Sequence, residues 1–257
     1  IKDSQKYLPE FLEDIIEKNL NCINFIKTPN DQLPLFNGAT SLNLGQIQKY
    51  LDDYKLNTKN NNLGGLFKIK YKNHFLIADI DKPPQKKFSK SYQSGPLSFE
   101  YFLDGVKIIT NSGFGSHISK KVELLSRLTA CQSTLTINDT SITKFEKNEM
   151  IGKIFGNSIK DSFKSFDFFS KNEDRLVGFC STNNGYEKKF GCTHKREIYC
   201  DKENNFLRGT DHIFKQKDGY PIRYAFRFHI NPELSVVKTM SGNSALIQIS
   251  KNKSLIF

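Results

Sequence analysis

The chain of 257 residues is long enough to bury a large core and to form one or two domains. It contains no apolar run of about eighteen residues, the length that a membrane-spanning helix needs, so we expect no membrane span. The formal net charge of +11 predicts an anionic partner, which would be nucleic acid, lipid headgroups or an acidic polysaccharide. Most of the 38 cationic residues are lysines in a chain rich in Asn and Ile, and codon bias in an AT-rich genome explains that composition equally well.

Cysteine and histidine are too scattered to predict a structural metal site. None of the five Cys stands in a C-x-x-C pair, and none of the five His pairs with another at metal-ligand spacing. We expect the cysteines to be buried apolar residues, with a disulfide between Cys192 and Cys200 across a hairpin as the alternative. The chain begins at Ile1 without a basic and then apolar signal segment, so we expect an internal piece of a longer polypeptide.

Two helices are predicted near the N-terminus. Between residues 8 and 26, apolar residues recur at spacings of three and four with charged residues between them, and Pro9 suits a first helical turn. A second, shorter helix is predicted over 44–54. The polar segment 57–65, which ends in Gly64 and Gly65, predicts a linker.

Beyond this linker the apolar period changes from helical to strand-like. Residues 66–80 predict a hairpin that turns at Lys72 and Asn73, and residues 97–113 predict a second hairpin with Asp104 and Gly105 in its turn. Many short strands at this spacing predict a mainly β fold, an antiparallel β-sandwich preceded by a short α-helical segment. The further predicted strands are 133–137, 175–182, 192–200, 206–215, 223–230, 235–240 and 244–250.

The order of several sequence blocks carries a resemblance to one family. The blocks are 33–39, 97–113, 129–139, 193–199, 207–211 and 222–232. In this order they resemble the heparinase II/III-like polysaccharide lyases, whose C-terminal domain is a β-sandwich. The resemblance implies that residues 1–60 are the C-terminal end of an α-helical toroid domain and that residues 61–257 are the sandwich domain.

Lyases of this family cleave polysaccharides that contain uronic acid by β-elimination. Neutralising the uronate carboxylate dominates that chemistry, because the proton beside a carboxylate is only weakly acidic. Most catalytic groups, including a Tyr, belong to the toroid, so the resemblance implies that this fragment alone is inactive. It also implies an acidic polysaccharide rather than nucleic acid as partner, and a location in the periplasm or cell envelope. The sequence gives neither the sugar nor the oligomeric state.

The resemblance also places the family's metal site on three residues of this chain. Counting back from the second hairpin, the family's catalytic His falls at Ser91, its first metal-binding His at Gln93 and an Asp at Gly95. The second metal ligand falls at Asn111 and the third at Gln132. Carboxamides are poor zinc ligands and carry no compensating charge. We therefore expect neither a metal nor another cofactor, and a hydrogen-bonded substitute for the metal site.

A basic strand face is a further candidate site. His194 and Arg196 fall on one face of a predicted strand, and Arg208 lies on the next strand. Together these side chains are suited to bind sulfate, carboxylate or phosphate. The alternatives are a solvated face and an internal ion pair with Glu197 or Asp211.

The predicted site residues support two functions. In a lyase, the sandwich would form one wall of a substrate groove with Tyr92, Gln93, Arg127, His194 and Arg196. The alternative is a non-catalytic protein on the same scaffold that binds polyanionic carbohydrate or serves the cell envelope. The absence of the family's catalytic His and of its metal ligands favours this alternative.

Overall fold

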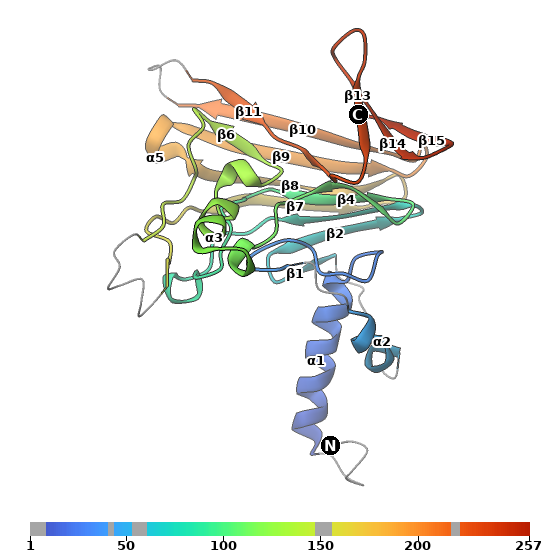
Figure 1. Ribbon diagram of the computed structural model, residues 1–257. Helices are drawn as coiled ribbons and strands as arrows, with labels where there is room; N and C mark the ends of the chain where they lie inside the picture. Colours follow the sequence, from blue (N-terminus) through green and yellow to red (C-terminus); the bar gives the residue numbers. More distant parts are fainter. Residues whose placement is uncertain (1–8, 41–43, 53–60, 147–155, 217–221) are drawn as a thin grey trace.

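The computed structural model describes residues 9–40, 44–52, 61–146, 156–216 and 222–257. Two antiparallel sheets lie face to face, and helix α1 (Glu10–Ile26) projects away from them, as Figure 1 shows. The predicted fold class, an antiparallel β-sandwich preceded by a short helical segment, is confirmed. No helix among the described residues is long and apolar enough to span a membrane.

The helical part forms where the sequence predicts it. Helix α1 begins directly after Pro9, and the shorter α2 (Gly45–Asp52) follows. Leu20 and Phe25 of α1 are buried, whereas Phe11 and Ile15 are 62% and 49% exposed. The apolar face of α1 is therefore covered only near its C-terminal end.

The first sheet has six strands in the order β1-β2-β3-β4-β5-β12. Both predicted hairpins are present in it, and Asp104 and Gly105 make the second turn with φ of 51° and 79°, the backbone that a tight two-residue turn requires. The strands are β1 (Asn62–Leu63), β2 (Leu66–Tyr71), β3 (His74–Asp79), β4 (Phe99–Leu103), β5 (Val106–Thr110) and β12 (His229–Ile230).

The predicted linker over 57–65 is wrong at its C-terminal end. Asn62 and Leu63 pair with β2, and Gly64 and Gly65 form the turn between the two strands with φ of 60° and 82°. Glycine adopts this left-handed backbone without steric cost, so the two glycines serve a tight turn. Residues 57–60 lie outside the described residues.

The second sheet has four strands in the order β10-β9-β8-β7 and packs on the first across a continuous core. Phe67 of the first sheet meets Phe179 of the second with ring centroids 5.2 Å apart. Such apolar contacts between two inner faces stabilise a sandwich. The strands are β7 (Ser165–Asn172), β8 (Leu176–Tyr186), β9 (Cys192–Asp201) and β10 (Phe206–Lys215).

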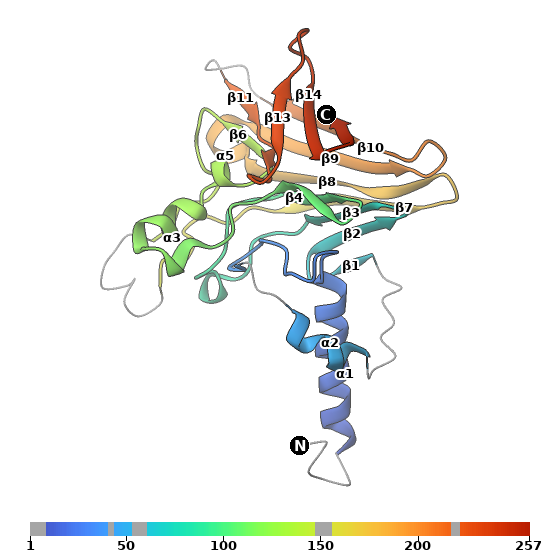
Figure 2. The same cartoon turned by 45° about the vertical axis from the view of Figure 1, so that its right-hand side comes forward.

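Smaller elements complete the described fold. Strand β6 (Leu135–Ile137) pairs with β11 (Tyr224–Phe226), and a separate three-stranded sheet forms near the C-terminus (Figure 2). That sheet contains β13 (Ser235–Lys238), β14 (Ala245–Ser250) and β15 (Lys253–Ile256), and the short helices are α3 (Lys120–Ser126), α5 (Glu187–Phe190), η1 (Lys86–Phe88), η2 (Gly115–His117) and η3 (Thr129–Cys131).

Two further predictions need correction. The single strand expected over 223–230 is divided, because its first half pairs with β6 in one sheet and its second half pairs with β5 in another. The alternative of a disulfide between Cys192 and Cys200 is wrong, because both residues lie on β9 and all five cysteines are free.

Candidate functional site

Three amide side chains converge at one end of the first sheet. Gln93 comes from the long loop after β3, Asn111 follows β5, and Gln132 follows η3. All three are buried, with exposed fractions of 1% to 2%. We call these three residues the amide cluster, and they are the positions to which the sequence resemblance assigns the family's metal ligands.

The amide cluster is organised around the carbonyl oxygen of Ser126. The Nε2 atoms of Gln93 and Gln132 donate to this oxygen over 3.2 and 2.8 Å, and Ser112 Oγ donates to it over 3.2 Å. Ser126 is the last residue of α3, so its carbonyl has no partner within the helix. The amides therefore satisfy a helix-terminal acceptor that burial would otherwise leave without a partner.

Asn111 joins the cluster through its other neighbours. Its Oδ1 accepts a hydrogen bond from Ser133 N over 2.8 Å, beside Gln132. Its backbone N–H donates to the buried carboxylate of Glu100 over 3.2 Å. The same carboxylate forms an ion pair with Lys107 at 3.0 Å. Burial raises the pKa of Glu100, and the Lys107 ammonium opposes that rise. Asn111 Nδ2 is the one cluster donor without a protein partner among the described residues.

The donor set of the amide cluster does not fit a metal ion. Gln93 and Gln132 turn N–H groups toward the shared centre, and an N–H group offers no lone pair to a cation. Within the described residues, no group of three or more His, Cys, Asp or Glu side chains is arranged to hold a metal. The nearby carboxylate of Glu100 is already occupied by Lys107 and Thr110.

Gly95, to which the sequence resemblance assigns an Asp of the family, is closely packed against the cluster. A Cβ atom added there would lie 2.8 Å from Gln132 Cγ and 2.9 Å from Ser98 Oγ. No side chain fits at this position unless Gln132 moves. The position of the Gln132 side chain therefore requires glycine at residue 95.

The segment after α1 is bonded directly to the loop that carries Gln93. Gly38 N donates to Gln93 Oε1 over 3.2 Å, and Ser91 Oγ donates to Asn37 O over 3.3 Å. Gly38 has a φ of +100°, and a Cβ there would lie 2.6 Å from Ser91 Cβ. The helical part and the sandwich therefore meet at Ser91, the residue to which the sequence resemblance assigns the family's catalytic His. A serine hydroxyl is not a base at neutral pH.

Arg127 supports this loop from inside the protein. Its side chain is fully buried and donates to the carbonyl oxygens of Tyr92, Ser89 and Asn157 over 2.7 to 2.8 Å. The guanidinium also lies 4.0 Å from the ring centroid of Phe145. Burial lowers the pKa of Arg127 to about 10. Arg127 thus fixes the backbone on which Tyr92 and Gln93 stand.

Arg196 supports the site from the second sheet. It pairs with both oxygens of Asp211, at 2.7 and 3.0 Å, and its Nη1 donates to Leu97 O and Ser133 O over 2.7 and 2.9 Å. His194 Nε2 lies 2.7 Å from Asp211 Oδ1. Burial would raise the pKa of Asp211, but its bonds to His194 and Arg196 outweigh burial and hold that pKa well below its usual range.

The five residues that the sequence predicts to contact substrate lie inside the protein, and their contact with substrate stays a prediction. Tyr92, Gln93, Arg127, His194 and Arg196 are all buried, with exposed fractions of 0% to 2%. Their side chains lie inside the sandwich or beneath the loops. For the basic strand face, the structure shows the alternative that the sequence left open, an internal ion pair with Asp211.

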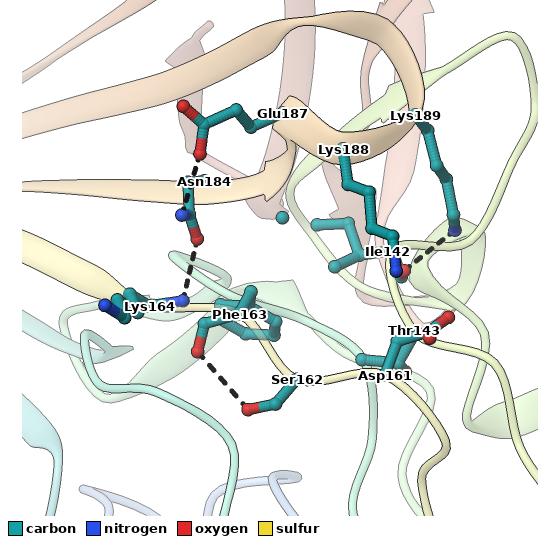
Figure 3. Close-up of a pocket in the computed structure, with 11 residues that line it drawn as sticks. Ile142, Thr143, Asp161, Ser162, Phe163, Lys164, Asn184, Glu187, Lys188 and Lys189 are labelled. Atoms are coloured by element: carbon teal, nitrogen blue, oxygen red, sulfur yellow. Dashed lines mark hydrogen bonds between the residues drawn. The ribbon is translucent and has the colours of Figure 1, made fainter.

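Sequence reasoning missed a pocket on the second sheet, shown in Figure 3. It has a volume of about 260 Å³ and lies beside α5 and the end of β8. Lys189 Nζ donates to the carbonyl oxygens of Ser141 and Ile142 over 2.6 and 2.8 Å, and Asn184 bridges Glu187 and Lys164. Its polar groups therefore mainly bind one another. The adjacent Lys188 and Lys189 were the only sequence signal, and a short lysine run does not predict a pocket.

The chain belongs to the heparinase II/III-like family, because the model of that family's C-terminal domain matches residues 56–257. No sequence among the curated proteins matches the chain.

Solved structures agree with this assignment at the level of the fold. A mutant of a heparan sulfate lyase from Pedobacter heparinus superposes with a TM-score of 0.70 at 15% identity, over 97% of this chain and 40% of that one. A crystal structure of heparinase III gives 0.68 at 16% identity, over 97% and 41%. The chain thus spans about two fifths of the length of these relatives.

Proposed function

We propose that this chain is the sandwich part of a polysaccharide lyase that cleaves uronic-acid-containing polysaccharide by β-elimination. The observation that carries the proposal is the family match over 56–257, together with the likeness to a heparan sulfate lyase and to heparinase III. The uncovered apolar face of α1 supports the toroid assignment of residues 1–60, because an amphipathic helix buries its apolar stripe against neighbours.

In this proposal the sandwich forms one wall of the substrate groove, near Ser91. The loop that carries Ser91 and Gln93 is hydrogen-bonded to Asn37 and Gly38, so this loop lies where the helical part and the sandwich join. Arg127 and Arg196 act as positioning residues, because each bonds several loop carbonyls and is itself buried. The proton-transfer groups for elimination then come from the toroid, since Ser91 replaces the family's catalytic His.

The amide cluster takes over the structural role of the metal in this proposal. A metal ion would fix three segments of the chain through coordination to imidazole and carboxylate ligands, whereas the cluster fixes the same three through hydrogen bonds of neutral amides. Each such bond contributes about 1 kcal/mol net, and leaving a partner unsatisfied costs about 1–3 kcal/mol. The arrangement holds without any dependence on metal supply.

A second candidate is a non-catalytic protein that binds polyanionic carbohydrate, in the periplasm or cell envelope. It is favoured by the serine at position 91, where the sequence resemblance places the family's catalytic His. Both candidates bind an acidic polysaccharide at the groove, and only the lyase cleaves that polysaccharide.

The test uses the complete parent protein and a panel of uronic-acid polysaccharides. β-Elimination creates an unsaturated uronate that absorbs in the ultraviolet, and its appearance would support the lyase. Polysaccharide binding without that absorbance would support the second candidate. Neither binding nor product from folded protein would contradict both.

A further inference from the structure

A basic groove lies at the end of the first sheet that is remote from the amide cluster. It is bounded by the end of α1, the outer face of β2 and the turns of the two hairpins, and has a volume of about 970 Å³. The amide-cluster loop leaves the opposite end of β3, after Asp79. We call this feature the lysine groove, after Lys68, Lys70 and Lys72.

Strand alternation places these lysines together. Phe67 and Ile69 point into the core, so Lys68 and Lys70 point to the other face of β2, and Lys72 follows in the turn. Alternate residues on a strand lie roughly 6–7 Å apart. Across the ladder, Lys68 pairs in register with Ile77 and Lys70 with Phe75, so no carboxylate opposes them.

The groove keeps a net positive charge after its ion pairs are counted. Asp31 pairs with Lys27 at 2.9 Å, and Asp104 pairs with Lys253 on β15. No carboxylate of the described residues forms an ion pair with Lys68, Lys70 or Lys72. Three ammonium groups therefore line one groove without an anionic partner from the described chain.

Lys68 is the most unusual of the three. Only 8% of it is exposed, and its Nζ donates to Phe25 O over 3.0 Å and lies 4.5 Å from the Phe25 ring centroid. An ammonium group has three donors, and among the described residues this is the one hydrogen bond that Lys68 Nζ donates. Burial, and then repulsion from Lys70, lower the pKa of Lys68 to about 8. A bound anion would oppose this lowering of the pKa, because a nearby negative charge stabilises the ammonium form.

We propose that the lysine groove binds sulfate or carboxylate groups of an acidic polysaccharide, as a second anion site separate from the region around Ser91. The charge, the spacing of the lysines and the unused donors of Lys68 support an anion with several charged groups. The choice of a polysaccharide as the source of those groups rests on the proposed function. Because the lysine groove lies at the other end of the sheet from Ser91, it would bind a part of the polysaccharide that is distant from the part near Ser91.

The test combines a local probe with polymer binding. The pKa of Lys68 is followed through its side-chain carbon resonance in the complete protein, with inorganic sulfate and, separately, with glucuronate. We expect at least one anion to raise that pKa by about one unit or more, as a nearby opposite charge does. The double variant Lys70→Ser with Lys72→Ser should lose most of this response.

The same variant should bind heparan sulfate oligosaccharides about tenfold more weakly, because two ion contacts are removed. The matched control is Lys121→Ser with Lys238→Ser, which removes two exposed lysines elsewhere and should bind like the native protein. An equal loss of oligosaccharide affinity in both variants would overturn the proposal that the lysine groove is an anion site. Binding of single-stranded DNA without binding of glycan would overturn it too. A Lys68 response without elimination refutes only the lyase, and elimination without a Lys68 response refutes only the groove.

Discussion

Gln93 and Gln132 donate hydrogen bonds to the same atom, the carbonyl oxygen of Ser126, from loops that are 39 positions apart in the sequence. A single helix-terminal acceptor thereby joins the loop after β3 to the segment after η3. Because both donors are buried, the pair acts as a fixed connection between these segments.

The first prediction concerns the cluster itself. Gln132→Ala removes a buried side chain and one of its hydrogen bonds, so the free energy of unfolding should fall by about 2–3 kcal/mol. Urea unfolding measures this change. Gln216→Ala, at an exposed glutamine, is the control and should stay within about 0.5 kcal/mol of the native protein. Equal stability of the two variants would mean that the cluster does not hold the loops.

A second prediction tests the packing of Gly95. Gly95→Ala should lower the free energy of unfolding by about 1–3 kcal/mol, because the new Cβ would lie 2.8 Å from Gln132 Cγ. Gly209→Ala is the control, since its Cβ would meet nothing closer than 3.9 Å. A native-like thermal midpoint for Gly95→Ala would contradict the close packing.

The third prediction concerns the buried pair of Arg196 and Asp211. Asp211→Asn leaves the Arg196 charge without a counter-charge, and should cost about 3–5 kcal/mol of stability at pH 7. The pKa of Asp211 is depressed in the folded state, so its stabilising contribution is present above about pH 4 and is lost as the pH falls.

The difference in unfolding free energy between native protein and Asp211→Asn should therefore shrink toward pH 2. Glu197→Gln is the control, because its partner Lys195 is partly exposed and such pairs contribute at most about 1 kcal/mol. A pH-independent difference for Asp211→Asn would show that its charge does not contribute.

The fourth prediction concerns Asp79, whose effect on stability changes with pH in the opposite direction to that of Asp211. Burial raises the pKa of Asp79 to about 7, although a hydrogen bond from Asp81 N opposes the rise. The unfolded chain ionises near pH 4, so stability should fall as the pH rises from about 4 to about 7, by up to about 4 kcal/mol. Asp79→Asn should remove this fall, as measured by urea unfolding at pH 5 and pH 8. An unchanged slope in the variant would contradict the raised pKa.

The sequence predicts the strands well because their signals are local. Asp104 and Gly105 mark a turn by residue type alone, and alternation around them defines β4 and β5. The division of 223–230 between two sheets depends on the partners β5 and β6, which local pattern does not contain. Gly64 and Gly65 illustrate the same limit, since glycines end a linker and make a turn equally well.

The site was only partly predictable for a related reason. The positions of Gln93, Asn111 and Gln132 follow from the family resemblance, but their shared acceptor is a backbone atom and leaves no trace in residue types. Arg196 on a strand with polar neighbours is typical of a solvated face. Its burial is decided by Asp211, which the register of β9 and β10 places directly opposite.

Thermal unfolding with zinc and with a chelator tests the metal-free amide cluster most directly. A comparison variant carries Gln93→His, Asn111→Asp and Gln132→His, which restores the ligand types of the family. We predict that the midpoint of the native chain is the same in both conditions, whereas zinc raises that of the variant. Tight binding stabilises a folded protein by about 4 kcal/mol at a thousandfold excess over the Kd, and shifts the midpoint by several degrees. A zinc-dependent rise of that size in the native chain would contradict the replacement of the metal by the amide cluster.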